Sequence, residues 1–268
     1  TKRRRAPLVI KLKEGYSIKY VPAISGESFA HAYQENIVKI AQLLYTDFLP
    51  ICPHCMRGEF FKSMDDDHAI EAAKKAVSVD LKKRDKEEIR RRKSLFEEET
   101  VRRCIVEDIG GFLYAGKLPV RRTSRFEVSY IIPVFESIEA TAIEPQLHAR
   151  HAPSESGVER QESEEGQRPA AAQMIYYVET SSALYGFSFN IDIDGIGRTS
   201  MVDVKDVVDH EERVRRIKVA LGALALTLTG FAFGAKRSRF LPISEMDSMV
   251  AAVSEKIPFS VSSPVIND

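Results

Sequence analysis

The stretch ESFAHAYQENIVKIAQLL, residues 27–44, places apolar side chains three and four positions apart, which predicts an amphipathic α-helix. Ser25 stands just before this stretch, where helix N-caps are commonly found. The amides of the first turn either hold an anion or are simply capped by Ser25. Two β-like segments, within residues 1–12 and 16–24, come before the helix. The chain therefore opens with two strands followed by a helix.

The segments after this helix alternate between strand-like and helical patterns. Strand-like patterns lie at residues 125–135, 140–152 and 174–193, and the last reads as two strands. A long helix is expected from about residue 204 to residue 232. The order strand, helix, several strands, helix and strand is typical of an α+β fold, and a split βαβ sheet is the leading arrangement.

Three segments differ from this pattern in composition. Residues 50–106 look like a mostly helical insertion that ends in charges of both signs, as solvated helices do. Residues 107–119 contain Gly and Pro, so we expect a loop or hairpin tip. Residues 152–173 are polar and acidic, and we expect a mobile loop there. Residues 1–49 and 120–268 then form one discontinuous domain.

The overall composition limits the function only weakly. Among 268 residues, 39 Lys and Arg balance 39 Asp and Glu, so partners must be inferred from local charge clusters. The chain starts at Thr1 without a signal segment and has an odd cysteine count, so we expect a cytoplasmic protein whose own N-terminus is missing. Residues 219–235 carry no charge, but they continue an amphipathic start, which favours a buried helix over a membrane span.

Sequence motifs of enzymes are missing from the chain. It has no G-x-S-x-G, Walker A or H-E-x-x-H motif and no well-formed dinucleotide fingerprint. Asp192 and Asp194 alternate in a pattern that a metal can use, but a turn at a strand end is the simpler interpretation. We therefore expect a protein that is not an enzyme and that requires no cofactor.

The sequence CPHC at residues 52–55 is half of a common zinc arrangement. A closed zinc site needs four ligands, and the set predicted from the sequence is Cys52, Cys55, His68 and Cys104, with His54 as a further candidate. Reduced, partly buried thiols are the alternative. A redox role is disfavoured because no thioredoxin-like βαβ pattern surrounds the two cysteines.

Cations cluster beside aromatic and hydroxyl side chains at residues 2–5, 121–126, 148–151 and 236–239. Arg and Lys neutralise phosphates, Ser and Thr bond to phosphate or sugar oxygens, and aromatic rings stack on bases. Solvated surface charge explains such clusters equally well. Their positions near the ends of predicted elements favour a single-stranded nucleic acid as the partner.

Six stretches are long and specific enough to compare with known families. They are TKRRRAPLVIK (1–11), YVPAISGESFAHAYQ (20–34), DIGGFLYAGKLPVRRTSRFEVSYIIP (108–133), QLHARH (146–151), YYVETSSALYGFSF (176–189) and GAKRSRFLP (234–242). Together they resemble the DevR-type CRISPR-associated backbone subunit of archaeal type I-A Cascade, in the repeat-associated mysterious protein (RAMP) superfamily. The insertion and the acidic loop are the divergent parts.

The resemblance implies an RRM-like palm at residues 1–49 and 120–268, the helical insertion at 50–106 and a thumb-like loop at 107–119. Copies of the chain would coat CRISPR RNA (crRNA) as a right-handed helical filament. The guide would stay free to pair with target DNA in antiviral defence. Further implied partners are the other Cascade subunits, namely a RAMP-type end-capping subunit, the large and small subunits, a helicase and a nuclease.

The resemblance also implies which residues contact the RNA. They lie in a basic arm, the loop before the first helix, the segment after the thumb-like loop, a Q-x-H-x-R stretch and a second basic loop: Lys2, Arg3, Arg4, Ser25, Gly26, Arg121, Arg122, Thr123, Ser124, Arg125, His148, Lys236, Arg237, Ser238 and Arg239. Type III relatives cut target RNA with an Asp of the thumb loop, and Asp108 lies near that position. A metal-dependent ribonuclease that uses Asp108, or Asp192 and Asp194, is therefore the alternative. A helix-end acid is the simpler account of Asp108.

Overall fold

A computed structural model describes residues 5–60, 63–78, 85–134, 137–138, 142–150, 174–230, 241, 243–257, 259 and 261. The chain divides into two compact units. Residues 1–24, 130–186 and 267–268 belong to the first unit, and residues 25–129 and 187–266 belong to the second. Their α-helices and antiparallel strands confirm the predicted α+β class.

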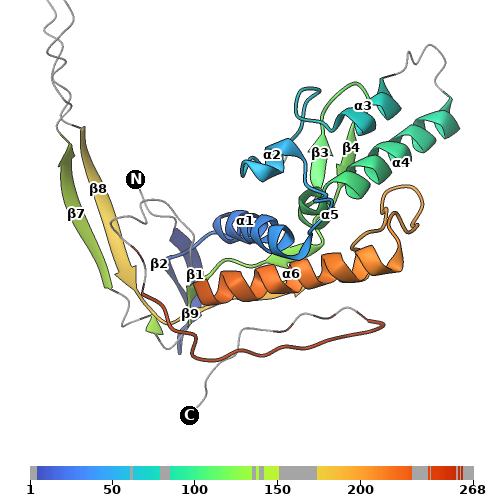
Figure 1. Ribbon diagram of the computed structural model, residues 1–268. Coiled ribbons are helices and arrows are strands. Elements are labelled where there is room, and N and C mark those ends of the chain that lie inside the picture. Colours follow the sequence, from blue (N-terminus) through green and yellow to red (C-terminus); the bar gives the residue numbers. More distant parts are fainter. Residues whose placement is uncertain are drawn as a thin grey trace, which may run out of the picture. The chain divides into compact units, whose positions relative to one another are not determined.

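The first unit consists of strands (Figure 1). It contains β1 (Arg5–Lys11), β2 (Tyr16–Pro22), β6 (Ile132–Pro133), β7 (Ala142–Arg150), β8 (Met174–Ser182) and β9 (Tyr185–Gly186). They pair antiparallel as β1–β2, β6–β9 and β7–β8, and an isolated bridge joins Ile24 to Ile131. The predicted second strand, after Glu14 and Gly15, is therefore the returning half of a hairpin.

The second unit contains all of the described helices and two short antiparallel pairs of strands. The helices are α1 (Gly26–Leu44), α2 (Pro53–Met56), α3 (Glu71–Val77), α4 (Lys86–Arg103), α5 (Ile105–Gly110) and α6 (His210–Gly230). The strands are β3 (Phe112–Tyr114), β4 (Val120–Arg122), β5 (Phe126–Val128) and β10 (Phe189–Ile191), paired as β3–β4 and β5–β10.

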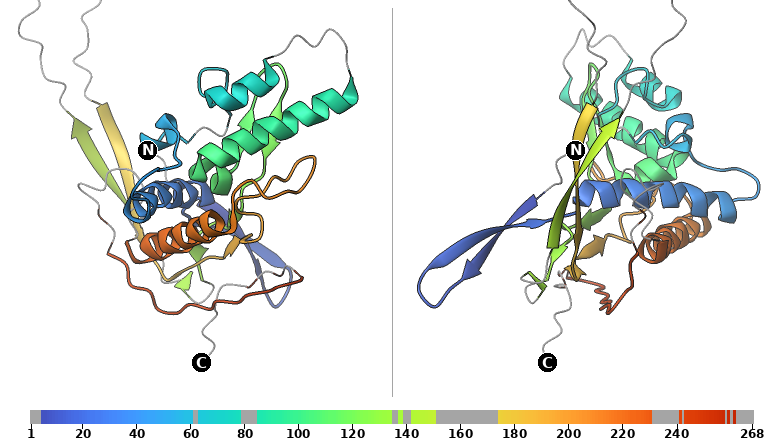
Figure 2. Two further views of the ribbon diagram at one scale, coloured as in Figure 1. Left: turned by 45° about the vertical axis from the view of Figure 1, so that its right-hand side comes forward. Right: turned by 90° about the vertical axis from the view of Figure 1, so that its left-hand side faces the viewer.

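Helices α1 and α6 lie side by side (Figures 1 and 2). The Tyr33 hydroxyl of α1 donates to the Ala220 carbonyl at 3.0 Å, and the Asn36 amide donates to Thr227 Oγ1 at 2.9 Å. The small residues of α6, such as Gly222 beside Ile40, thus allow the two helices to approach closely. Tyr33 also packs edge-on against the rings of Phe126 and Phe189, which joins the helix pair to β5 and β10.

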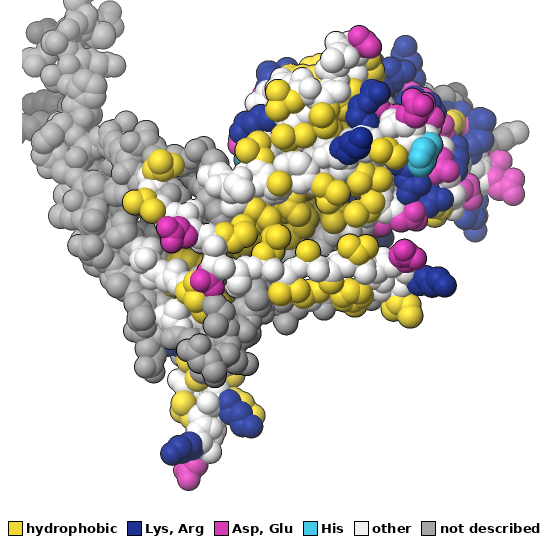
Figure 3. All heavy atoms as spheres, turned by 60° about the horizontal axis from the view of Figure 1, so that its bottom comes forward, with side chains coloured by type: hydrophobic (Ala, Val, Ile, Leu, Met, Phe, Trp, Pro, Cys, Tyr) yellow, Lys and Arg dark blue, Asp and Glu magenta, His cyan; other side chains and the backbone are white. Residues whose placement is uncertain are grey.

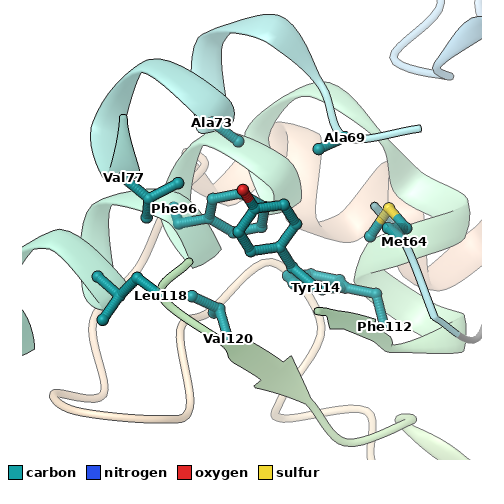
Figure 4. Close-up of a cluster of buried hydrophobic side chains, with 9 residues drawn as sticks. All are labelled: Met64, Ala69, Ala73, Val77, Phe96, Phe112, Tyr114, Leu118 and Val120. Carbon is teal, nitrogen blue, oxygen red and sulfur yellow. The ribbon is translucent and has the colours of Figure 1, made fainter. Parts of the chain in front are cut away.

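A separate apolar cluster fixes the helices of residues 50–106 onto the β3–β4 pair (Figure 4). Phe96 of α4 stacks on Tyr114 of β3 with ring centroids 4.5 Å apart, at the centre of the cluster. The other members are Met64, Ala69, Ala73, Val77, Phe112, Leu118 and Val120. Residues 50–106 therefore share an apolar core with the β3–β4 pair and, within the described residues, are mostly helical.

The start of helix α6 and the arrangement of the described strands differ from what the sequence predicts. Helix α6 begins at His210, later than predicted, because Asp209 Oδ1 accepts from the amide of Glu212 at 2.8 Å and so caps the helix. The described strands form five two-stranded sheets rather than one split βαβ sheet. An RRM-like palm with its insertion and thumb-like loop therefore stays a prediction.

Candidate functional site

The basic segment at residues 121–125 is divided between the surface and the interior of the second unit. Arg121 and Thr123 are exposed, whereas Arg122 between them is buried. This alternation follows from the strand β4, in which successive side chains point to opposite faces. Arg121 and Thr123 are thus positioned for an external ligand, and Arg122 is not.

The guanidinium of Arg122 is bonded entirely within the protein. Its side chain is 0% exposed and lies 2.8 Å from Glu97 Oε1 and 2.5 Å from Asp108 Oδ1. It also donates to the carbonyls of Asp108, Gly195 and Arg198. Burial with two carboxylates and three carbonyls leaves no donor for a phosphate, so we remove Arg122 from the predicted RNA-contacting residues.

Asp108 joins two buried arginines. Its Oδ1 accepts from Arg122, and its Oδ2 accepts from Arg216 of α6 at 2.8 Å. The amide of Gly197 donates to both oxygens, at 3.2 and 2.9 Å. Although burial opposes the charged form of Arg216, Asp108 and Glu212 raise the pKa of its guanidinium. Asp108 is therefore a structural acid in this arrangement, because its two oxygens are already occupied.

The loop that contains Gly197 has, at this residue, a backbone conformation that favours glycine. Gly197 has φ of 75°, in the left-handed region, and an added Cβ would lie 2.8 Å from Val208 Cγ2. Glu97 anchors the continuation of the same loop by accepting from the amides of Ser200 and Met201. Residues 195–201 are thus fixed to the acids of α4 and α5.

Arg125 also forms an internal ion pair. Its Nη1 lies 3.0 Å from Asp192 Oδ2, and its side chain is 12% exposed. Burial lowers the pKa of Arg125, and the nearby charge of Arg122 lowers it further. Asp192 in turn accepts from the amide of Gly195 at 3.0 Å, which confirms the predicted turn after strand β10. Asp194 pairs with Arg198 and Arg213, so both acids of this turn already have cationic partners.

Ser25 and Gly26 lie at the start of α1. Ser25 accepts from the amide of Ser28 at 3.3 Å, which confirms the predicted N-cap. A Cβ on Gly26 would lie 2.8 Å from the carbonyl oxygen of Val128, so this turn packs closely against the end of β5. The structure therefore brings the predicted loop of Ser25 and Gly26 next to the strand that follows Arg125. Ser124, which precedes Arg125, bonds through its Oγ to the backbone of Phe126.

Two of the predicted basic segments lie outside the described residues. The described residues do not include Lys2, Arg3, Arg4, Lys236, Arg237, Ser238 and Arg239. They also do not include the acidic segment at 152–173. His148 lies on β7 opposite Tyr176 of β8, and only its backbone is described. Contact of these residues with RNA stays a prediction.

The three cysteines come together in the second unit. The Sγ atoms of Cys52, Cys55 and Cys104 all lie within 4.8 Å of one another, and all three side chains are buried. Cys52 caps the short helix α2, and its sulfur accepts from the amide of Cys55 at 3.5 Å. Cys104 is the junction of α4 and α5, and the next amide, of Ile105, donates to the Pro50 carbonyl at 2.8 Å.

Glu107 adjoins this thiol cluster, which we define as Cys52, Cys55 and Cys104. The Cys55 thiol donates to Glu107 Oε1 at 3.1 Å, and burial raises the pKa of Glu107 to about 8. Hydrogen bonds from Cys104 and Cys55 lower the pKa of Cys52 to about 3. The thiol cluster and Glu107 are thus buried together in the second unit.

His68 does not join the thiol cluster, so the ligand set predicted from the sequence is corrected. Its Nδ1 lies 2.5 Å from Asp65 Oδ1, within the turn MDDDH. His54 does not join it either, and its Nδ1 lies 3.0 Å from Glu59 Oε2. Both imidazoles bond to carboxylates near them in sequence rather than to the site of the three sulfur atoms.

The sequence did not single out Glu97, Glu107 or Arg216. A usable signal was present, because Glu97 falls three and four positions before the buried residues Thr100 and Val101. Arg216 likewise precedes buried Val219 and Ala220 at spacings of three and four. A charge on the apolar face of a helix indicates a buried partner.

Charges elsewhere on the second unit are paired and mixed. Arg102 and Arg103 of α4 each bond to a glutamate four positions earlier, Glu98 and Glu99, as expected of a solvated helix. Figure 3 shows cations and acids interspersed at the upper right, whereas hydrophobic side chains cover the middle of the same face. No helix in the described ranges is both long and apolar enough to span a bilayer.

Comparison with known proteins identifies the family. The model of the family described as CRISPR-associated negative auto-regulator DevR/Csa2 matches residues 1–268. This chain belongs to that family. The predicted resemblance to DevR-type CRISPR-associated proteins is thereby confirmed.

Curated proteins that are similar to this chain come from Saccharolobus solfataricus and Methanocaldococcus jannaschii. The CRISPR-associated protein Cas7/Csa2 1 of Saccharolobus solfataricus is 37% identical over 265 residues, covering 99% of this chain and 74% of the relative. The CRISPR-associated aCascade subunit Cas7/Csa2 2 of the same organism is 38% identical over 264 residues, covering 97% and 73%. The Cas7/Cst2/DevR protein of Methanocaldococcus jannaschii is 28% identical over 256 residues, covering 94% and 72%.

Proposed function

We propose that this chain is a non-catalytic backbone subunit of a type I-A CRISPR surveillance complex, working in the cytoplasm of an archaeon. Copies would assemble along crRNA and present the guide for pairing with target DNA. The observation that supports this most strongly is the 38% identity over 264 residues with a protein named as an aCascade subunit. Its other partners would be the remaining subunits of that complex.

The surface features of the second unit support an RNA-backbone contact. Arg121 and Thr123 are exposed side by side on the outer face of β4 and its continuation. Arg121 supplies a cation for a phosphate, and Thr123 supplies a hydroxyl for a phosphate or sugar oxygen. The capped turn at Ser25 and Gly26 adds backbone amides near the end of β5. Together these groups read the RNA backbone and not its sequence.

The ion pairs of Asp108, Asp192 and Asp194 favour a structural role over the ribonuclease alternative. Asp108 accepts from Arg122, Arg216 and Gly197, so a divalent cation would have to displace two arginines to reach it. Asp192 and Asp194 are paired with Arg125 and Arg213. Nothing in these contacts prepares an acid for phosphodiester cleavage.

The test is assembly on RNA of increasing length. We expect the mass of the complex, measured by analytical ultracentrifugation, to rise in regular steps as single-stranded RNA is lengthened. Binding should weaken steeply with added salt, because phosphate contacts release counterions. A complex whose mass stays at one copy on every RNA would overturn the backbone role. Clean cleavage of labelled RNA on addition of Mg²⁺ or Mn²⁺ would overturn the non-catalytic assignment.

A further inference from the structure

The thiol cluster has the composition and burial of a metal site. Three buried sulfur atoms within 4.8 Å of one another come from two separate places in the chain, a CPHC turn and the α4–α5 junction. Cys-x-x-Cys turns in which a backbone amide donates to the first sulfur are suited to holding two thiolates on one ion. Cys104, which follows residues 56–103 in the sequence, adds a third sulfur to this group.

Glu107 provides a second observation that indicates a cation. Glu107 is buried, with 5% of the residue exposed, and its Oε1 lies 3.1 Å from Cys55 Sγ. In the part of the chain that the structure describes, this carboxyl forms no ion pair. By contrast, the carboxylate of Asp108, the next residue, forms ion pairs with two arginines. A buried carboxylate next to three sulfur atoms is stabilised when a bound cation supplies positive charge.

We propose that Cys52, Cys55 and Cys104 bind one structural zinc ion, with Glu107 as the fourth ligand. Thiolates select soft or borderline ions, and a carboxylate suits zinc better than it suits Cu(I). Glu107 must turn toward the other two sulfur atoms when the ion binds, because it belongs to no group of donors all within 4.8 Å of one another. The inference is independent of the proposed contact with RNA.

A zinc ion at this position would link the start of residues 50–106, at α2, to their end, at the α4–α5 junction. The chain between Cys55 and Cys104 carries α3 and α4, and the site would close both onto α5. Glu107 lies next to Asp108, so the bound ion would also hold the helix that supplies the buried acid between Arg122 and Arg216. Zinc would therefore stabilise the second unit and take no part in a reaction.

The first measurement is the metal content of the full chain purified from zinc-supplemented cells. We expect about one zinc ion per chain by elemental analysis, released in step with modification of the thiols by a mercurial reagent. Reduced protein reconstituted with Co²⁺ should show sulfur-to-cobalt charge-transfer bands. Zinc well below one ion per chain after incubation with excess ZnCl₂, or iron or copper in its place, would overturn the proposal.

Variants then assign the ligands. Cys52→Ser and Cys104→Ser should lose bound zinc, and Glu107→Gln should weaken its affinity about tenfold or more. His68→Ala is the matched control and should keep a full zinc ion. Loss of zinc from His68→Ala, or unchanged affinity in Glu107→Gln, would overturn the ligand set. If the cysteine variants fail to fold, the cobalt spectrum and zinc release of the wild type still decide the question.

Discussion

Arg122 Nη2 lies 2.5 Å from Asp108 Oδ1, and neither side chain is exposed to solvent. This pair connects β4 to α5, and through Arg216 it extends to α6. A basic segment that resembles an RNA-contacting motif therefore contributes one of its cations to the interior of the protein. The remaining cation of the RR pair, Arg121, is left at the surface.

Replacement of the buried acid should be strongly destabilising. Asp108→Asn keeps the size of the side chain but leaves two buried arginines short of a negative charge, which should cost about 3–5 kcal/mol. The matched control is Asp192→Asn, since this carboxylate also pairs with an arginine but is 52% exposed, and it should cost less than about 1 kcal/mol. Urea unfolding measures both. Equal stability of Asp108→Asn and wild type would contradict the assigned network.

Close packing of α1 on α6 predicts the effect of a bulky residue at Gly222. An added Cβ would lie 3.2 Å from Ile40 Cγ2, so the longer side chain in Gly222→Leu must push the helices apart. We expect a loss of about 1–3 kcal/mol from overpacking. Leu221→Ala, on the exposed side of the same helix, is the control and should change stability little. A melting temperature unaffected by Gly222→Leu would mean that the two helices do not pack as described.

Ser25 allows its capping role to be separated from anion binding. Ser25→Asp keeps an N-cap and complements the helix dipole, so stability should be preserved, whereas Ser25→Ala should lose about 1 kcal/mol. If the first turn of α1 contacts a phosphate, the added charge of Ser25→Asp should lower RNA affinity by about tenfold or more. Thermal unfolding and RNA titration distinguish the cases. Full RNA affinity in Ser25→Asp would show that Ser25 only caps the helix.

The sequence predicted the elements whose signals are local. The apolar spacing from Phe29 to Ala41 and the Ser25 cap lie within one helix, and α1 spans Gly26–Leu44 as expected. The turn after β10 was also predictable, because the side chain of Asp192, the first residue of the turn, accepts from the amide of Gly195. Neither feature needs a partner from a distant part of the chain.

Features that depend on distant partners were not predictable in the same way. Arg121 and Arg122 are identical in type, and which of them is buried depends on the face of β4 that α4, α5 and the 195–201 loop cover. The three cysteines meet as expected, but His68 is not among them, because it bonds to Asp65 three positions before it. This contact lies within one turn of the chain, and the spacing of possible metal ligands in the sequence does not reveal it.

Arg121 and Arg122 are adjacent in sequence but differ in exposure, so their alanine variants should differ in effect. Arg121→Ala should leave the melting temperature unchanged, because its side chain is exposed, and should reduce the slope of log affinity against log salt by about 0.7 for a lost single-strand phosphate contact. Arg122→Ala should instead destabilise the second unit by about 3–5 kcal/mol, because it leaves Glu97 and Asp108 buried with fewer partners.

Arg103→Ala controls for the simple loss of a surface cation, since Arg103 is half-exposed on α4 and pairs with Glu99. It should change neither the salt slope nor stability by much. RNA titrations across a salt series, with thermal unfolding of the same samples, report both quantities. If Arg121→Ala and Arg103→Ala bind RNA alike, β4 does not line the RNA path. If Arg122→Ala keeps its stability and loses RNA affinity, its guanidinium faces the RNA and the buried network does not form.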